Sequence, residues 1–115
     1  MAARLENIIY PVKDIDQAKA LFTALLGTAP TQDAPYYVGF EVEGQPTVGL
    51  DPNGHRKGLT APVPYWKVED IEASIAELTG AGATLGEKPQ DVGGGRQIAT
   101  VTDSAGNVIG LVQDA

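Results

Sequence analysis

The stretch VKDIDQAKALFT at Val12–Thr23 sets the architecture, because it returns later in the chain as VEDIEASIAELT at Val68–Thr79. Both stretches begin with valine, have an Asp-Ile pair two residues on, share an alanine in the middle and end in threonine. Such repetition is typical of a chain built from copies of one supersecondary unit. The sequence therefore predicts two similar modules.

Each copy is expected to form a helix. Asp14 and Asp70 stand at the N-cap, where a short carboxylate accepts a hydrogen bond from a free backbone N–H group. Glycine follows each helix as a stop signal, at Gly27 in the first copy and at Gly80 or Gly82 in the second. Apolar residues recur at helical spacing. They are Ile15, Ala18, Leu21, Phe22, Leu25 and Leu26 in the first copy and Ile71, Ile75 and Leu78 in the second.

One β-rich run precedes each helix and three follow it, separated by turn-forming residues. The predicted strands are Leu5–Val12, Thr28–Gln32, Tyr36–Val42 and Thr47–Leu50, then Val63–Val68, Ala83–Glu87, Arg96–Thr102 and Asn107–Gln113. Each half is thus β-α-β-β-β. We expect a single α+β domain over residues 1–115, with module 1 at about 1–54, module 2 at about 60–115, and a connecting loop at Asp51–Pro62.

Composition excludes several classes of function. The chain has 115 residues, no cysteine, and fifteen Asp and Glu against eight Lys and Arg, a net charge of −7. Nucleic acids and anionic membranes are poor partners for such a surface. No apolar run approaches the about 18 residues that indicate a membrane span, and the N-terminus lacks the pattern of a signal peptide. We expect a cytoplasmic protein.

Two glycines lie inside predicted strands, where glycine is unusual. Gly49 in Val48–Leu50 and Gly110 in Ile109–Leu111 occupy equivalent places in the two modules. Glycine within a strand often marks the close approach of a ligand or of another backbone. Two at equivalent positions indicate a shared local geometry.

The order and spacing of these motifs resemble the vicinal-oxygen-chelate superfamily, which includes glyoxalase I, bleomycin-resistance proteins and extradiol dioxygenases. The resemblance implies paired βαβββ modules that form a curved, mostly antiparallel sheet around a cavity, with helices on the outer face. It also implies a divalent metal held from four strand positions. Their counterparts here are Asn7, Gly49, Val63 and Gly110.

This chain departs from the metal-binding pattern at all four positions. Valine and glycine have no donor side chain, and one asparagine amide is a weak ligand. We therefore expect no metal and no cofactor, and we expect the two glycines to leave empty volume in the cavity.

Strand alternation separates the two faces of the expected sheet. The predicted ligand-binding wall comprises Asn7, Ile9, Thr47, Gly49, Asp51, Val63, Tyr65, Lys67, Val108 and Gly110, with Arg96 added from a glycine-rich loop. The predicted helix-facing core comprises Ile8, Tyr10, Val12, Val48, Leu50, Trp66, Val68, Ile109 and Leu111.

Several residues have two interpretations. Lys67 either binds an anionic group or extends to water. The Gly93–Gly95 loop is either a hairpin turn or a mobile flap that carries Arg96. One of Tyr36 and Tyr37 faces inward, and alternation does not say which.

The groups that could move protons are also few. The single histidine, His55, is expected to be solvated in the connecting loop. Glu41, Asp51 and Tyr65 are candidate proton carriers, although no catalytic residue is assigned.

These observations favour a metal-free protein that binds a small, partly apolar molecule, similar to drug-sequestering bleomycin-resistance proteins. The resemblance also implies a homodimer, and the acidic balance favours cationic ligands. The alternative is a glyoxalase-like lyase or an extradiol-dioxygenase-like enzyme, possible here without a metal. A third interpretation is a structural or regulatory protein with a vestigial cavity.

Overall fold

The computed structural model describes residues 3–57 and 59–115, leaving out the side chains of His55 and Lys57. The chain has an α+β fold that divides into two compact units. The N-terminal unit is Asn7–Val63, and the C-terminal unit is Pro64–Ala115 together with residues 3–6. Each unit combines one α-helix with a small sheet, as the duplicated sequence predicts.

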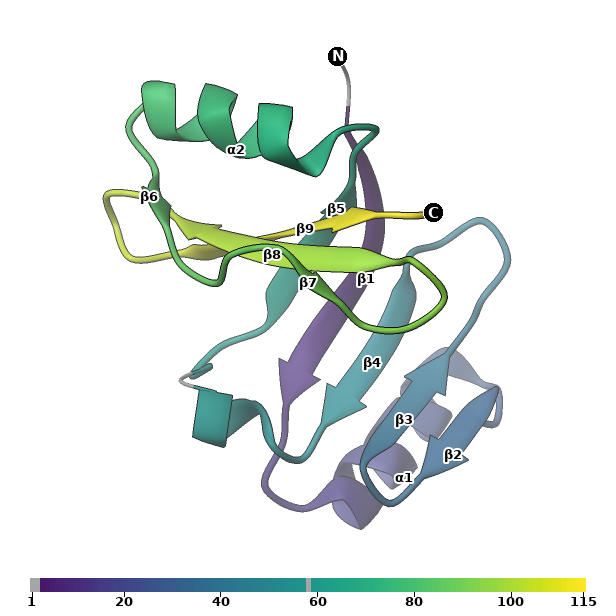
Figure 1. Ribbon diagram of the computed structural model, residues 1–115. Helices are drawn as coiled ribbons and strands as arrows, with labels where there is room; N and C mark the ends of the chain where they lie inside the picture. The colour runs from purple at the N-terminus through teal and green to yellow at the C-terminus, as the bar shows by residue number, and fades with distance from the viewer. Residues whose placement is uncertain (1–2, 58) are drawn as a thin grey trace. The chain divides into compact units, whose positions relative to one another are not determined.

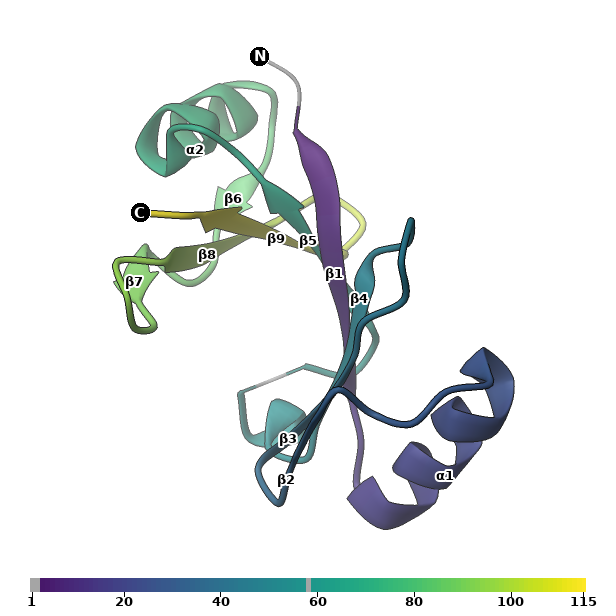
Figure 2. The same ribbon diagram turned by 90° about the vertical axis from the view of Figure 1, so that its right-hand side faces the viewer.

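In the N-terminal unit the strand order is β2-β3-β4-β1. The elements are β1 (Arg4–Pro11), α1 (Ile15–Leu26), β2 (Gln32–Ala34), β3 (Tyr37–Phe40), β4 (Thr47–Asp51) and a 3-10 helix (Gly54–Lys57). Strands β1 and β4 are parallel, whereas β2, β3 and β4 pair in antiparallel fashion. Helix α1 lies beside one face of these strands, which Figure 2 shows nearly edge-on.

Helix α1 begins and ends where local chemistry predicts. The Asp14 carboxylate accepts a 3.0 Å hydrogen bond from the Gln17 backbone N–H, which satisfies one free donor of the first turn. Gly27 ends the helix in the left-handed conformation at φ 69°, which glycine adopts without a steric penalty. Leu21 and Leu25 are 62% and 74% exposed, so the buried stripe of α1 is narrower than predicted.

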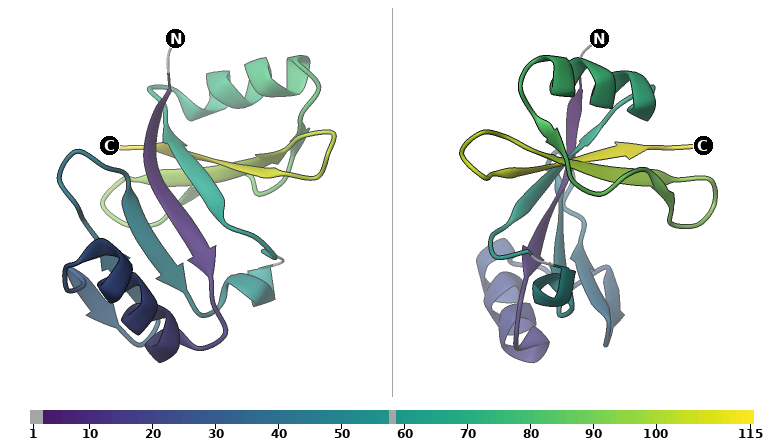
Figure 3. Two further views of the ribbon diagram at one scale, coloured as in Figure 1. Left: turned by 180° about the vertical axis from the view of Figure 1, so that it is seen from behind. Right: turned by 60° about the vertical axis from the view of Figure 1, so that its left-hand side comes forward.

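The core of the N-terminal unit lies between α1 and the sheet. Its buried residues are Ala18, Val38, Phe40 and Leu50, with Tyr10, Val12, Ile15, Phe22, Leu26 and Val48 packed against them. The Phe22 ring lies 4.9 Å from that of Tyr10 and 6.3 Å from that of Phe40, measured between centroids. Figure 3 shows α1 crossing this sheet.

In the C-terminal unit the strand order is β5-β9-β8-β6, and β7 also pairs with β8. The elements are β5 (Val63–Lys67), α2 (Ile71–Gly80), β6 (Thr84–Leu85), β7 (Gln90–Asp91), β8 (Gln97–Thr102) and β9 (Val108–Gln113). Strands β5 and β9 are parallel, and the β8-β9 hairpin is antiparallel. Helix α2 lies along one face of β8 and β9 (Figure 1).

Two side chains hold the start of α2. Asp70 accepts a hydrogen bond from the Ala73 N–H at 3.1 Å, and the side-chain oxygen of Gln113 accepts one from the Ile71 N–H at 2.7 Å. The helix then runs through Gly80 and is capped at Ala81. Its core comprises Val68, Ile71, Ile75, Ala99, Val101 and Leu111, with Trp66, Leu78, Ala83 and Ile109 packed against it.

The helix-facing set predicted by alternation is confirmed in both cores except at Ile8, which is half-buried outside either cluster. Three segments differ from prediction. The strand expected at Thr28–Gln32 is displaced to Gln32–Ala34, because Pro30 has no N–H for a ladder. Strand β7 was not predicted, and residues 54–57 of the expected loop form a 3-10 helix.

No helix among the described residues is long and apolar enough to cross a membrane.

Candidate functional site

The space above Gly49 is filled by neighbouring side chains. Gly49 lies between Ile9 of β1 and Gly39 of β3 in the sheet. A Cβ atom at Gly49 would lie 2.6 Å from Ile9 Cδ1 and 2.9 Å from Tyr37 Cε1, with the Tyr37 hydroxyl also in contact. The Tyr37 ring also lies against Gly39, 3.1 Å from the position of a Cβ there. Tyr37 therefore rests across two glycines.

The same arrangement recurs at Gly110 in the C-terminal unit. Gly110 pairs with Tyr65 of the parallel strand β5. A Cβ atom at Gly110 would lie 2.6 Å from both Cγ and Cε2 of the Tyr65 ring. The expectation that the two glycines leave empty volume is therefore wrong. In each unit a tyrosine from an adjacent strand occupies the space, because glycine allows an aromatic ring to lie close to the backbone.

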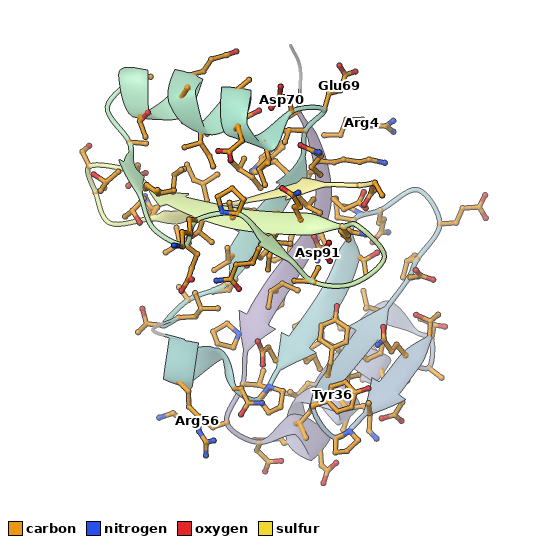
Figure 4. The ribbon with its side chains drawn as sticks, viewed as in Figure 1. Arg4, Tyr36, Arg56, Glu69, Asp70 and Asp91 are labelled. Carbon is orange, nitrogen blue, oxygen red and sulfur yellow. The ribbon has the colours of Figure 1, made fainter. Side chains whose placement is uncertain are left out.

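Tyr37 is the residue that sequence reasoning left undecided. Tyr36 is 67% exposed, and Figure 4 shows it at the turn between β2 and β3. Tyr37 is half-buried and points to the sheet face that carries no helix. The signal that identifies it is the Tyr37-x-Gly39 spacing, since residues two apart on a strand share a face.

In the N-terminal unit, polar side chains lie on β1 and β4, the strands next to the Tyr37 ring. Asn7 pairs with Thr47 across β1 and β4, and the Asn7 side-chain oxygen is buried with no hydrogen-bond partner among the described residues. Asp51, 8% exposed, accepts a 2.8 Å hydrogen bond from the Asn53 N–H. A buried acceptor without a partner costs free energy, so the Asn7 oxygen is a destabilising feature of this part of the sheet.

The two basic residues predicted for the wall are engaged in ion pairs. Lys67 Nζ lies 3.0 Å from Asp114, and Arg96 lies 3.4 Å from Asp114 and 3.1 Å from Glu6. The hydrogen bond from Lys67, followed by the charge of Arg96, lowers the pKa of Asp114 below its ordinary value. Lys67 therefore forms an ion pair with a carboxylate of its own unit.

The glycine-rich loop that precedes Arg96 is a closed turn. Gly93, Gly94 and Gly95 all have positive φ, at 113°, 63° and 81°. The Val92 N–H donates to the Arg96 carbonyl at 2.8 Å, and the Arg96 N–H donates to the Gly93 carbonyl at 3.1 Å. The hairpin interpretation of this loop fits these hydrogen bonds.

The predicted wall residues fall into two groups. In the N-terminal unit, Asn7, Ile9, Thr47, Gly49 and Asp51 lie on the paired strands β1 and β4, while Val63 is buried where β5 begins. In the C-terminal unit, Tyr65 and Lys67 lie on β5, Val108 and Gly110 on β9, and Arg96 joins Lys67 through Asp114. Their role in binding a ligand stays a prediction.

The side chains at the four family metal positions do not fit a divalent ion. Val63 offers no donor, and the space of a side chain at Gly49 or Gly110 is taken by a tyrosine ring. No group of three or more His, Cys, Asp or Glu that could hold a metal occurs among the described residues. The His55 side chain lies outside them, so the expectation that it is solvated is not addressed.

Two pockets lie beside the helices, away from the predicted wall. One, of about 230 Å³, is lined by Ile15, Asp16, Lys19, Asp33, Ala34, Pro35 and Val38. The other, of about 260 Å³, is lined by Ala3, Trp66, Val68, Ser74, Glu77, Leu78, Ile109 and Leu111. In the first, Lys19 and Asp33 form an ion pair at 3.2 Å.

The sequence model of the Glyoxalase/Bleomycin resistance protein/Dioxygenase superfamily matches residues 4–111. No curated protein matches the chain.

Solved structures share the fold. A glyoxalase/bleomycin resistance protein/dioxygenase superfamily member from Vibrio splendidus 12B01 is 19% identical over 98% of this chain and 100% of that chain, with a TM-score of 0.71. Methylmalonyl-CoA epimerase from Mycobacterium tuberculosis is 18% identical over 97% and 88%, with a TM-score of 0.70. The Mn(II)-bound glyoxalase from Novosphingobium aromaticivorans is 19% identical over 98% of this chain but 40% of that one, with a TM-score of 0.71.

Proposed function

Because the chain belongs to the Glyoxalase/Bleomycin resistance protein/Dioxygenase superfamily, we propose that it binds a small organic molecule without a metal, as drug-sequestering members of that family do. The ligand contacts the sheet face of the N-terminal unit that carries no helix. One observation carries the proposal: tyrosine rings fill the side-chain space at two of the four positions where the family places metal ligands.

The chemistry of this face supports an uncharged or weakly polar ligand. Tyr37 presents aromatic surface on this face, and Ile9 of the same unit adds an aliphatic group. The one buried side-chain oxygen without a partner among the described residues, that of Asn7, lies on β1 of the same unit. Mostly apolar walls with a few placed polar groups are typical of small-molecule sites.

The binding test uses a panel of uncharged aromatic antibiotics, with metal-free bleomycin as the cationic comparison, and a thermal-shift readout. We expect binding to persist after chelation with EDTA. Tyr37→Ala weakens it at least tenfold, whereas Tyr36→Ala, a matched change at an exposed neighbour, leaves it within about twofold. Stoichiometric bound metal that supports turnover would contradict the proposal, and so would equal effects of the two substitutions.

A metal-independent acid–base enzyme is the second candidate, favoured by the buried carboxylate of Asp51. A buried carboxylate near a ligand face is suited to proton transfer. In this case the protein catalyses exchange of a proton next to a carbonyl group in deuterated water, and Asp51→Asn abolishes the exchange without loss of ligand binding. Absence of exchange over the probe panel removes this candidate.

The family resemblance also leads us to propose a cytoplasmic homodimer. Strand β2 forms the edge of the N-terminal unit's sheet with three residues, and a sheet edge offers unpaired backbone groups to a second chain. Light scattering after size-exclusion chromatography gives the mass, and a monomer at micromolar concentration rejects the dimer.

A further inference from the structure

The pocket beside α2 is the feature of the C-terminal unit that the proposed function does not use. It lies between α2 and strands β5 and β9, with Ala3 at its margin. Its volume is about 260 Å³, slightly below the about 300–1,000 Å³ of pockets for drug-sized ligands. It therefore suits a molecule with a single ring or a short aliphatic chain.

The lining is apolar apart from two side chains. Trp66, Val68, Leu78, Ile109, Leu111 and Ala3 provide the apolar surface. Ser74 and Glu77 are the polar members, and they lie three residues apart on α2. Residues at this spacing share a helix face. The lining thus combines the Ser74 hydroxyl, the exposed Glu77 carboxylate and the Trp66 indole.

The lining of this pocket carries negative charge alone, because Glu77 is its one charged residue among the described residues. The segment 68–87 adds Glu69, Asp70, Glu72 and Glu87, and it is bordered by Lys67 and Lys88. Among the described residues, no ion pair neutralises Glu77. Arg4 follows the lining residue Ala3, but it does not line the pocket, and Figure 4 shows its guanidinium pointing away from α2.

We propose that this pocket binds a small organic cation with a hydrophobic body, of the class of primary amines that carry one ring. The ammonium group pairs with the Glu77 carboxylate, and the hydrophobic body packs against Leu78, Ile109 and the Trp66 indole. The net charge of −7 favours the approach of a cation over that of an anion.

Trp66 is the single tryptophan of the chain, so its fluorescence reports directly on this pocket. The purified chain is titrated with three probes of nearly equal shape: phenethylamine, phenethyl alcohol and phenylacetate. We expect a saturable change of Trp66 emission with the amine, a weaker affinity for the alcohol by about three- to tenfold, and no saturation with the anion. Added salt weakens the amine and leaves the alcohol unchanged.

Two variants that each remove one negative charge from α2 test where the ammonium group binds. Glu77→Gln reduces the preference for the amine over the alcohol to within about twofold, because the ion pair is lost. Glu72→Gln removes the same charge from the same helix at a residue outside the pocket, and it leaves the preference unchanged. Circular dichroism verifies that both variants fold.

The proposal fails if the amine gives no saturable signal, if the three probes bind alike, or if Glu72→Gln has the same effect as Glu77→Gln. Tyr37→Ala supplies the link to the proposed function. It leaves amine binding at Trp66 unchanged, because Tyr37 is not among the lining residues. Glu77→Gln thus tests the pocket, and Tyr37→Ala tests the ligand face of the proposed function. One proposal can therefore fail without the other.

Discussion

Gly110→Ala tests the contact between glycine and tyrosine most directly. The added Cβ would lie 2.6 Å from Cγ and Cε2 of Tyr65, about 1 Å inside ordinary van der Waals contact. The atoms in conflict belong to the root and edge of a ring rather than to a flexible chain end. Tyr65 must therefore rotate away, or β5 must separate from β9.

The expected loss in the free energy of unfolding follows from the packing around Gly110. Overfilling a well-packed site destabilises a protein by about 1–3 kcal/mol, and replacing a strand glycine by alanine returns about 0.4–1 kcal/mol through the unfolded chain. The net expectation is a loss of about 1–2 kcal/mol. With an unfolding entropy of about 2.1 cal/mol/K per residue, a chain of 115 residues then loses about 4–8 °C in Tm.

Urea and thermal unfolding, followed by circular dichroism and by Trp66 fluorescence, measure this loss. Gly80→Ala is the matched control, because a Cβ there meets nothing within 4 Å and alanine favours the helix. The double variant Gly110→Ala with Tyr65→Ala removes the obstructing ring. We expect its loss to be at least about 1 kcal/mol smaller than the sum of the single losses, as for residues in contact.

The reasoning is refuted if Gly110→Ala is as stable as Gly80→Ala. It is also refuted if the two single losses simply add, since that would mean that the glycine and the ring do not compete for space.

Three other predictions concern the caps and the ion pairs. Asp70→Ala lowers the free energy of unfolding by about 1 kcal/mol, because the Ala73 N–H loses its acceptor; urea unfolding at pH 7 measures it, and an unchanged midpoint contradicts it. Gly27→Ala costs about 1 kcal/mol in the same assay, since φ is 69° there; a more stable variant would mean that the cap is not left-handed. The pKa of Asp114, read by carboxyl NMR titration, lies below 3.8 and rises in Lys67→Met. A lowered folded pKa stabilises the fold above the unfolded value and loses this contribution as the pH falls through the folded value, so Lys67→Met destabilises at pH 6 but not at pH 2.

Local chemistry made the helices predictable. Asp14 and Asp70 cap the first turn of each helix, and Gly27 ends α1. Each of these contacts lies within one helical turn of the residue, so the local sequence is enough to predict it. Alternation likewise placed Trp66 on the helix side, because the period of a strand is set by the backbone.

Contacts across strands were not predictable in the same way. The sequence marks Gly49 and Gly110 as unusual, but whether a ligand, a backbone or a side chain fills the space depends on which strand is the neighbour. The register of Tyr65 opposite Gly110 decides it. The ion pair between Arg96 and Glu6 was equally unpredictable from local sequence, because 90 positions separate the two residues.

The link between Glu6 and Arg96 bears on the order in which the molecule folds. Residues 3–6 join a unit whose other residues begin at Pro64. Closing a loop of 90 residues costs about 4 kcal/mol of chain entropy, which only a largely formed C-terminal unit can offset. During synthesis, residues 3–6 leave the ribosome well before the C-terminal unit is complete, and they are then among the last to reach their native neighbours.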